Sequence, residues 1–145
     1  MAGLGGGATG KIIITASGPA EGDEFEGGFL ICQNSNVYWI VSPSSSEVSR
    51  SWNNRNDANT RAQQVSGCTG WFVPTMAQLR NPGYECRTHW DSYSSANYWS
   101  CEEHPNLANY GGYGYACLHG FGNNIPNPSP KPGTMCVRSF RCVTY

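Results

Sequence analysis

Residues 84–134 show neither the spacing of an amphipathic helix nor a sustained strand alternation, and they are rich in aromatic residues, glycine and asparagine. Prolines stand on alternate positions near the end of this stretch, a pattern typical of a stiff, extended spacer. They are Pro126, Pro128, Pro130 and Pro132. We therefore predict that residues 84–134 form a loop-rich excursion, carried by a scaffold that the rest of the chain must supply.

The strands of that scaffold are predicted on both sides of the excursion. Residues 11–15 are β-branched and predict a first strand, and residues 28–40 predict a hairpin that turns at residues 33–36. The acidic residues 18–27 are interpreted as a solvated turn, with a cation site as the alternative. Residues 135–145 alternate well enough to form one terminal strand.

Two short helices are predicted between the strands. Apolar residues recur at helical spacing between residues 51 and 65. They are Trp52, Ala58, Ala62 and Val65. Thr75 and Gln78 match a capping box, which opens a second helix that ends before Pro82. The sequence thus predicts one α+β domain over residues 11–145, preceded by a glycine-rich arm over residues 1–10.

The charge balance narrows the possible partners. With 9 basic and 10 acidic side chains, the formal net charge is -1, so no positive field would gather phosphates, and we predict no nucleic-acid partner. No apolar run approaches the roughly 18 residues of a membrane span, and none is predicted. The first residues lack the basic and apolar segments of a secretory signal, so we predict a protein made in the cytoplasm.

Seven cysteines raise the question of disulfides or a metal. An odd number leaves at least one thiol free or paired between chains, and spacing does not fix a connectivity. Cys136 and Cys142 cannot bridge each other, because six residues of strand separate them by about 20 Å. Three close pairs offer the ligands that Zn²⁺ prefers. They are Cys86 with His89, Cys101 with His104, and Cys117 with His119.

The chemical motifs in the sequence are incomplete. A structural zinc site normally includes a C-x-x-C element, which this chain lacks, so we predict neither metal nor cofactor. Residues 5–11 match the first half of a phosphate-binding loop, but Ile12 stands where Mg²⁺ needs a hydroxyl. No nucleophile motif accompanies the histidines, so we predict no enzyme activity. A zinc-stabilised domain or an enzyme is kept as the third alternative.

The excursion has the composition of a binding surface. Tyrosine gives large contact area at low entropic cost, and glycine, serine and asparagine give adaptable hydrogen bonds. About half of the aromatic residues, Trp99 above all, are expected in the core instead. The candidate ligand-binding residues are Tyr93, Tyr110, Tyr113, Tyr115, His119, Phe121, Asn123 and Asn124.

Four short segments, taken together, resemble a known family. They are the helix around residues 52–65, Gly-Trp-Phe-Val-Pro-Thr at 70–75, Tyr-Trp-Ser at 98–100, and Val-Arg-Ser-Phe-Arg at 137–141. This combination resembles the C-terminal domain of collagen-like bacterial adhesins, whose C-type-lectin-like fold is frequent in phage virion proteins. The resemblance implies a structural role for a set of framework residues. They are Trp71, Pro74, Thr75, Trp99 and Arg138.

The same resemblance limits which activities can be transferred. Residues 140–143 also look like the end of formylglycine-generating-enzyme-like domains, but the Arg-Gly-Gly-Ser-Trp segment of those domains is missing. The Trp-Asn-Asp and Glu-Pro-Asn calcium motifs of sugar-binding C-type lectins are also missing. Neither that catalysis nor calcium-dependent sugar binding is therefore implied.

We accordingly expect a non-enzymatic structural and attachment protein of a phage virion, on a tail, fibre or capsid surface. The arm and first strand would dock on a neighbouring copy or another virion protein, and the aromatic loops would face other virion proteins or host glycans. The alternative is a bacterial adhesin or appendage subunit that binds a saccharide at the cell surface.

Overall fold

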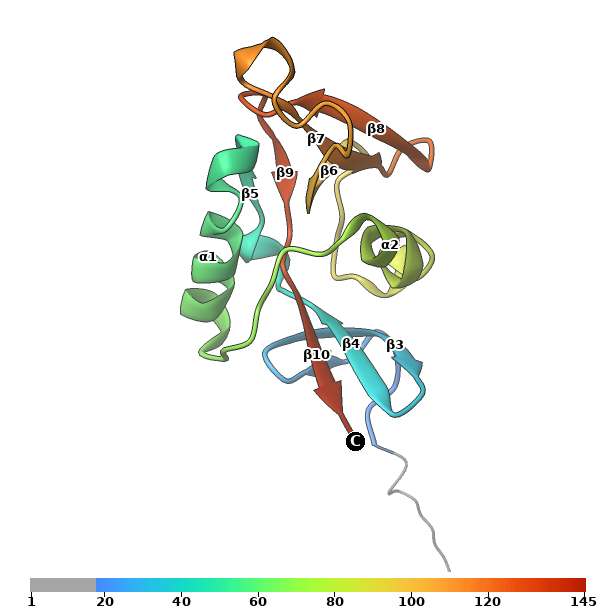
Figure 1. The fold of residues 1–145 in the computed structure, drawn as a ribbon. Coiled ribbons are helices and arrows are strands. Elements are labelled where there is room, and N and C mark those ends of the chain that lie inside the picture. The colour runs from blue at the N-terminus through green and yellow to red at the C-terminus, as the bar shows by residue number, and fades with distance from the viewer. Residues whose placement is uncertain (1–17) are drawn as a thin grey trace, which may run out of the picture.

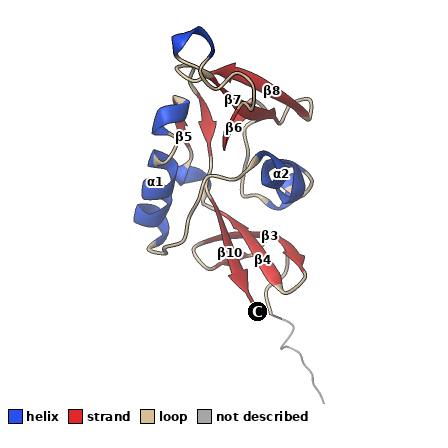
Figure 2. Cartoon of the chain, viewed as in Figure 1, coloured by secondary structure: helices blue, strands red, loops and turns tan. Residues whose placement is uncertain are grey.

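The computed structural model describes residues 18–145 and has an α+β fold with two sheets and short helices (Figures 1 and 2). The glycine-rich arm and the strand expected at residues 11–15 lie outside the described residues. One sheet has the order β10-β4-β3-β2, and the other has the order β5-β9-β6-β7-β8. Among residues 18–145, no helix is both long and apolar enough to cross a membrane.

The four-stranded sheet is built on the predicted hairpin, which the structure confirms. β3 (Gly28–Asn34) pairs antiparallel with β4 (Val37–Val41). Ser35 and Asn36 turn the chain with φ of 50° and 67°, the left-handed region that such tight turns use. The short β2 (Glu24–Phe25) covers one edge of β3, and β10 (Phe140–Thr144) pairs with β4 on the other side.

The predicted terminal strand is wrong in one respect, because it is two strands. β9 (Met135–Val137) belongs to the five-stranded sheet and β10 to the four-stranded one. The break falls at Arg138 and Ser139, whose side chains bond the remote residues Ser42 and Asn59. This change of sheet between β9 and β10 joins the two sheets through a single segment (Figure 1).

Residues 84–134 are more regular than expected, because three strands interrupt the predicted loop-rich excursion. They contain β6 (Asn97–Glu103), β7 (Tyr115–Gly120) and β8 (Ile125–Pro130), which with β5 (Val48–Arg50) and β9 form the five-stranded sheet. Three of the four alternate prolines are part of β8, an edge strand, where a residue without an N–H is tolerated on the outward side. A shift of register between Trp99 and Glu103 interrupts the pairing of β6 with β7.

The helices begin and end close to the predicted positions. A 3₁₀ turn (Trp52–Asn54) precedes α1 (Asp57–Ser66), so the helix starts later than expected, and Val65 is exposed rather than buried. The capping box is confirmed: Thr75 Oγ1 accepts from Gln78 N at 3.2 Å, and Gln78 Oε1 accepts from Thr75 N at 2.9 Å. It opens α2 (Met76–Gln78), which runs into a wider helical turn (Leu79–Tyr84).

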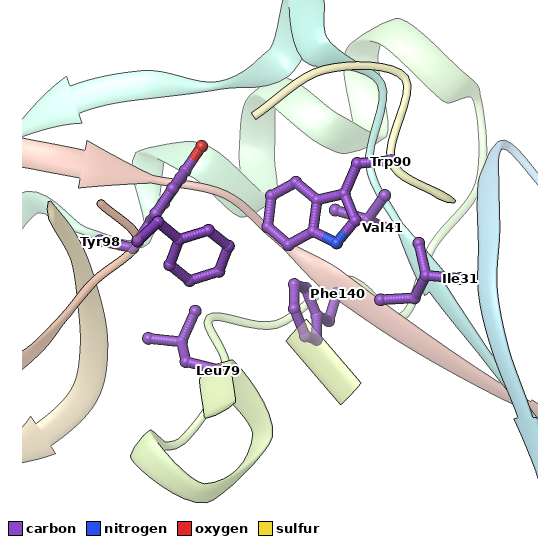
Figure 3. Close-up of a cluster of buried hydrophobic side chains, with 7 residues drawn as sticks. Ile31, Val41, Leu79, Trp90, Tyr98 and Phe140 are labelled. Atoms are coloured by element: carbon purple, nitrogen blue, oxygen red, sulfur yellow. The ribbon is translucent and has the colours of Figure 1, made fainter. Parts of the chain in front are cut away.

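The main core lies where the two sheets and the turns after α2 meet (Figure 3). Ile31 and Val41 come from the four-stranded sheet and Tyr98 from the five-stranded one, while Trp90 and Phe140 meet edge to face with ring centroids 5.8 Å apart. Each such side chain contributes about 1.5–3 kcal/mol when fully buried. Four of the expected framework residues are buried. They are Trp71, Pro74, Trp99 and Arg138.

Candidate functional site

Three tyrosines form an exposed cluster at one end of the molecule. Tyr110 and Tyr113 are 61% and 47% exposed, which places them among the most exposed large hydrophobic side chains of the described chain. The ring of Tyr115 lies between them in contact, with centroids 5.8 Å from Tyr110 and 6.0 Å from Tyr113. We call Tyr110, Tyr113 and Tyr115 the tyrosine cluster.

The loop that carries the cluster is shaped by glycine. Gly111, Gly112 and Gly114 have φ of 69°, 84° and 77°. A Cβ at Gly114 would lie only 1.7 Å from the carbonyl oxygen of Ala108, so no other residue fits there without moving the backbone. The 3₁₀ turn at Tyr110–Gly112 is the uppermost coil in Figure 1.

Backbone hydrogen bonds close this loop at its base. Tyr115 N donates to Leu107 O at 2.8 Å, and Gly114 N donates to Tyr110 O at 2.9 Å. His104 Nδ1 accepts the backbone N–H groups of Asn106 and Leu107 at 3.1 and 3.2 Å. The loop is therefore held by its own backbone and one imidazole, which gives the three rings a fixed platform.

A cation beneath the loop ties it to the rest of the domain. Lys131 N donates to Gly114 O at 3.0 Å, and Trp52 N donates to Lys131 O at 2.9 Å. The Lys131 ammonium pairs with Glu103 and lies 4.9 Å from the centre of the Trp52 ring. Because Lys131 is almost fully buried, it acts as an anchor for the loop and is not available to a ligand.

The cluster offers neutral, amphipathic chemistry. The hydrogen bond with Tyr113 raises the pKa of Tyr115 above its ordinary value, with a smaller contribution from burial, so this hydroxyl stays protonated at neutral pH. Ring faces of this kind stack on apolar C–H surfaces, and the hydroxyl groups donate and accept hydrogen bonds at their rim. Such a surface suits a neutral polyhydroxylated ligand or a polar peptide rather than an ion.

His119 and Phe121 do not belong to this surface, and their selection as ligand contacts is wrong. They are 1% and 3% exposed. His119 Nε2 is hydrogen-bonded to Asn124 Oδ1 at 2.8 Å, and Phe121 packs against Tyr98 with ring centroids 4.7 Å apart. Both rings lie in the interior because His119 is on the buried side of β7 and Phe121, which follows β7, packs in the main core.

The other candidate residues lie apart from the cluster. Tyr93 is half-exposed, but its ring packs against Trp90 and Phe121 of the main core. Asn123 and Asn124 form the turn between β7 and β8, where Asn124 has a φ of 58°. The structure therefore brings three of the eight candidate residues together in the tyrosine cluster, and the other five lie away from it around Phe121 and the turn after β7.

The cysteine and histidine pairs show no sign of a shared centre. Within residues 18–145, no three His, Cys, Asp or Glu side chains are placed to hold a metal ion. Burial raises the pKa of Cys86 to about 12, helped by the adjacent Cys32, and burial also raises the pKa of Cys101 and of Cys117. These thiols are thus poor nucleophiles at neutral pH.

An acidic groove of about 610 Å³ lies between β2, the turn at Ser44 and the end of α1, and the sequence patterns did not reveal it. Two of its carboxylates already have partners, because Glu26 pairs with Arg141 and Asp91 pairs with Arg138. Although burial alone would raise the pKa of Asp91, hydrogen bonds from Ser44 and the charge of Arg138 lower it below its ordinary value.

No protein-family model and no curated protein sequence matches this chain.

Proposed function

We propose that this chain is a non-enzymatic attachment module with a C-type-lectin-like fold, carried on the surface of a phage virion, and that the tyrosine cluster is its recognition surface. The observation that carries the proposal is the cluster itself. Three contacting rings, two of them about half exposed or more, stand on a loop whose glycines and backbone bonds fix its shape. Soluble domains seldom present such a patch without a partner for it.

The element order supports the proposed fold. β4 is followed by α1 and α2, then by β6, β7 and β8, and finally by β10, which returns to pair with β4. An excursion between α2 and the last strand is thus enclosed by pairing of an early strand with the terminal one. This is the arrangement that the resemblance to collagen-like adhesin domains implies.

The placement of the chain ends supports attachment through one end and recognition through the other. The carboxyl terminus and the start of the described chain lie together at one end of the molecule, and the turn at Tyr110–Gly112 lies at the opposite end (Figure 1). An assembly that held the end with the carboxyl terminus would leave the tyrosine cluster facing outward. The ligand we propose is a host surface saccharide, because exposed tyrosine rings offer apolar faces to sugar C–H groups and hydroxyls to sugar hydroxyls without a cation.

The side chains with catalytic potential support a non-enzymatic role. The buried His119 is engaged with Asn124, and the cysteines of the three Cys/His pairs have raised pKa values. A lowered pKa activates a thiol at neutral pH, and the pKa of each of these thiols is raised instead.

The test compares the wild-type chain with a variant in which Tyr110, Tyr113 and Tyr115 are all changed to serine. Tyr145→Ser is the matched control, since this tyrosine is also exposed but lies at the other end. We expect binding to an array of bacterial surface polysaccharides to be lost in the triple variant and kept in the control. Equal binding by all three proteins would refute the proposed surface.

The location is tested separately by immunoelectron microscopy with an antibody against the chain. Labelling of phage particles supports the virion assignment. Labelling of uninfected bacterial cells would instead support the alternative, an adhesin or appendage subunit at the cell surface.

A further inference from the structure

Two half-buried cysteines meet on one side of the main core. Cys32 lies in β3, and Cys86 precedes the 3₁₀ turn Arg87–His89 in a distant part of the chain. Both pack against the buried cluster that contains Ile31 and Trp90 (Figure 3), and β3 contacts this turn directly. The elements that carry the two cysteines are thus neighbours in the fold.

The carboxylate of Glu21 connects the segments that follow the two cysteines. Gln33 N donates to Glu21 Oε2 at 3.0 Å, and His89 Nε2 lies 3.6 Å from Glu21 Oε1. Gln33 comes directly after Cys32, and His89 comes three residues after Cys86. One side chain therefore spans the distance between the two segments, which holds the cysteines on the same side of the core.

The two side chains themselves interact. Burial raises the pKa of both Cys32 and Cys86. The hydrogen bond between the two side chains opposes this rise at Cys32 and adds to it at Cys86, which indicates that the Cys86 thiol donates to the Cys32 sulfur. Cys32 is therefore the member of the pair that ionises first.

Other cysteines close to this pair are poor partners for it. Cys142 stands opposite Trp39 of β4, and Trp39 stands opposite Cys32, so two strand spacings, about 9.5 Å, separate Cys142 from Cys32. A disulfide requires Cα atoms no more than about 7 Å apart. Cys136 packs against the same cluster, but its side chain is hydrogen-bonded to Ser94.

We propose that Cys32 and Cys86 form an intramolecular disulfide when the protein meets a disulfide oxidant such as oxidised glutathione. The Cys32 thiolate attacks one sulfur of the oxidant, forms a mixed disulfide and releases the first glutathione thiolate. The Cys86 sulfur then displaces the second glutathione thiolate. Two protein thiols are oxidised, one glutathione disulfide is reduced to two glutathiones, and the two protein protons pass to the departing thiolates.

The bond would tie the hairpin of β3 and β4 to the segment between α2 and β6. It closes the loop of residues 32–86, and cross-linking a long loop restricts the unfolded chain more than cross-linking a short one. A reducing cytosol would keep both thiols free, whereas an oxidising surface environment would favour the bond. The inference thus assigns a covalent modification that the proposed function does not include.

The experiment incubates the full chain with oxidised or with reduced glutathione at mildly alkaline pH, where more of each thiol is ionised. After an acid quench and alkylation of the remaining thiols, peptide mass spectrometry without reduction identifies the cross-linked peptides. Thermal unfolding followed by tryptophan fluorescence gives the melting temperature. Cys32→Ser and Cys86→Ser each remove one partner, and Cys142→Ser is the matched control.

We expect the oxidised wild type and Cys142→Ser to contain peptides joined through Cys32 and Cys86. Both proteins should melt roughly 10 °C higher than their reduced forms. Neither effect should appear in Cys32→Ser or Cys86→Ser. Glutathione adducts without a bridge, a bridge of different connectivity, or an oxidised wild type that melts no higher than its reduced form would overturn the proposal.

The connectivity is read directly in the wild type, so the test does not depend on the stability of the serine variants. Neither readout involves the tyrosine cluster. Failure here therefore leaves the proposed recognition surface in place.

Discussion

Arg138 Nη2 donates to Asp91 Oδ1 at 2.5 Å, which links the residue between the two sheets to a turn 47 residues away in the chain. The same guanidinium donates to Glu47 Oε1 at 2.9 Å and to Ser42 O at 2.8 Å, and it is 1% exposed. One buried cation therefore satisfies two carboxylates and two carbonyls, those of Ser42 and Ser92, at the point where β9 ends and β10 begins.

Replacing this cation should be costly. Arg138→Met keeps most of the volume but leaves both carboxylates without their partner, and we expect a loss of about 3–5 kcal/mol in the free energy of unfolding. Urea denaturation measures this loss of unfolding free energy. Arg50→Met is the control, because Arg50 pairs with Asp57 at the exposed surface, where a salt bridge contributes less than about 1 kcal/mol. Equal losses in both variants would contradict the assigned role.

Acid should weaken the same link. The pKa of Asp91 is lowered in the folded protein, so its contribution to stability is complete above the pKa of the unfolded state and is lost as the pH falls through the folded value. We expect the wild type to lose stability below about pH 4, the ordinary range of an aspartate. Asp91→Asn should be less stable at pH 7 and should show a shallower loss in acid. If the stability of the two proteins fell in parallel with pH, Asp91 would not be a source of the acid sensitivity.

The shape of the tyrosine loop should depend on Gly114 far more than on Gly112. Both have positive φ, but a Cβ would meet the Ala108 carbonyl at Gly114 and open space at Gly112. Gly112→Ala should cost about 1 kcal/mol from backbone strain alone. Gly114→Ala must also displace the loop, so we expect a clearly larger fall in melting temperature and loss of saccharide binding. Similar effects of the two changes would argue against a fixed loop.

Thiol chemistry should distinguish the half-buried Cys86 from the exposed Cys142 in the reduced protein. Cys142 is exposed, and burial is the only cause that raises its pKa, whereas burial, Cys32 and two carboxylates together raise the pKa of the half-buried Cys86 to about 12. In the native protein at pH 8, iodoacetamide should modify Cys142 well before Cys86. The rate at Cys86 should then rise about tenfold per pH unit between pH 7 and 9.5, as its thiolate fraction grows. Peptide mass spectrometry of timed samples follows both sites, and early labelling of Cys86 would contradict the expected order.

The prolines of β8 should act against self-association. Changing Pro126 and Pro128 to valine adds two outward N–H groups to an exposed edge without removing any bond to β7. We expect the double variant to form larger species at high concentration while its unfolding midpoint changes little. Pro132→Val, beyond the end of β8, is the matched control. A double variant with the same molar mass as the wild type would mean that the prolines do not guard this edge.

Local signals were sufficient for the hairpin and for the capping box, because a turn and a helix start depend on neighbouring residues. The break at Arg138 was not predictable from alternation, since the partners of Arg138 lie far away in the chain. β6 to β8 were missed because prolines and a register shift hide strand periodicity, and the tertiary context decides whether such a segment pairs.

The sequence predicted an exposed aromatic surface, but it did not predict which residues form that surface. Glycines beside Tyr110 and Tyr113 indicated an exposed loop, and the structure places those rings at the surface. His119 and Phe121 have the same local composition, yet they end in the core because β7 carries them between the sheets. Burial of an aromatic ring depends on which elements pack above it, and a single sequence does not contain that information directly.

The strand that changes sheets between β9 and β10 also bears on how the protein would respond to mechanical load. A pull on Tyr145 away from the domain acts along β10, whose rungs with β4 run from Phe140 to Thr144 and would have to shear rather than unzip one by one. If this ladder broke, the load would next act on the hydrogen bonds of Arg138 to Ser42 and Asp91. The end of the molecule that holds the carboxyl terminus thus resists separation of β10 from β4.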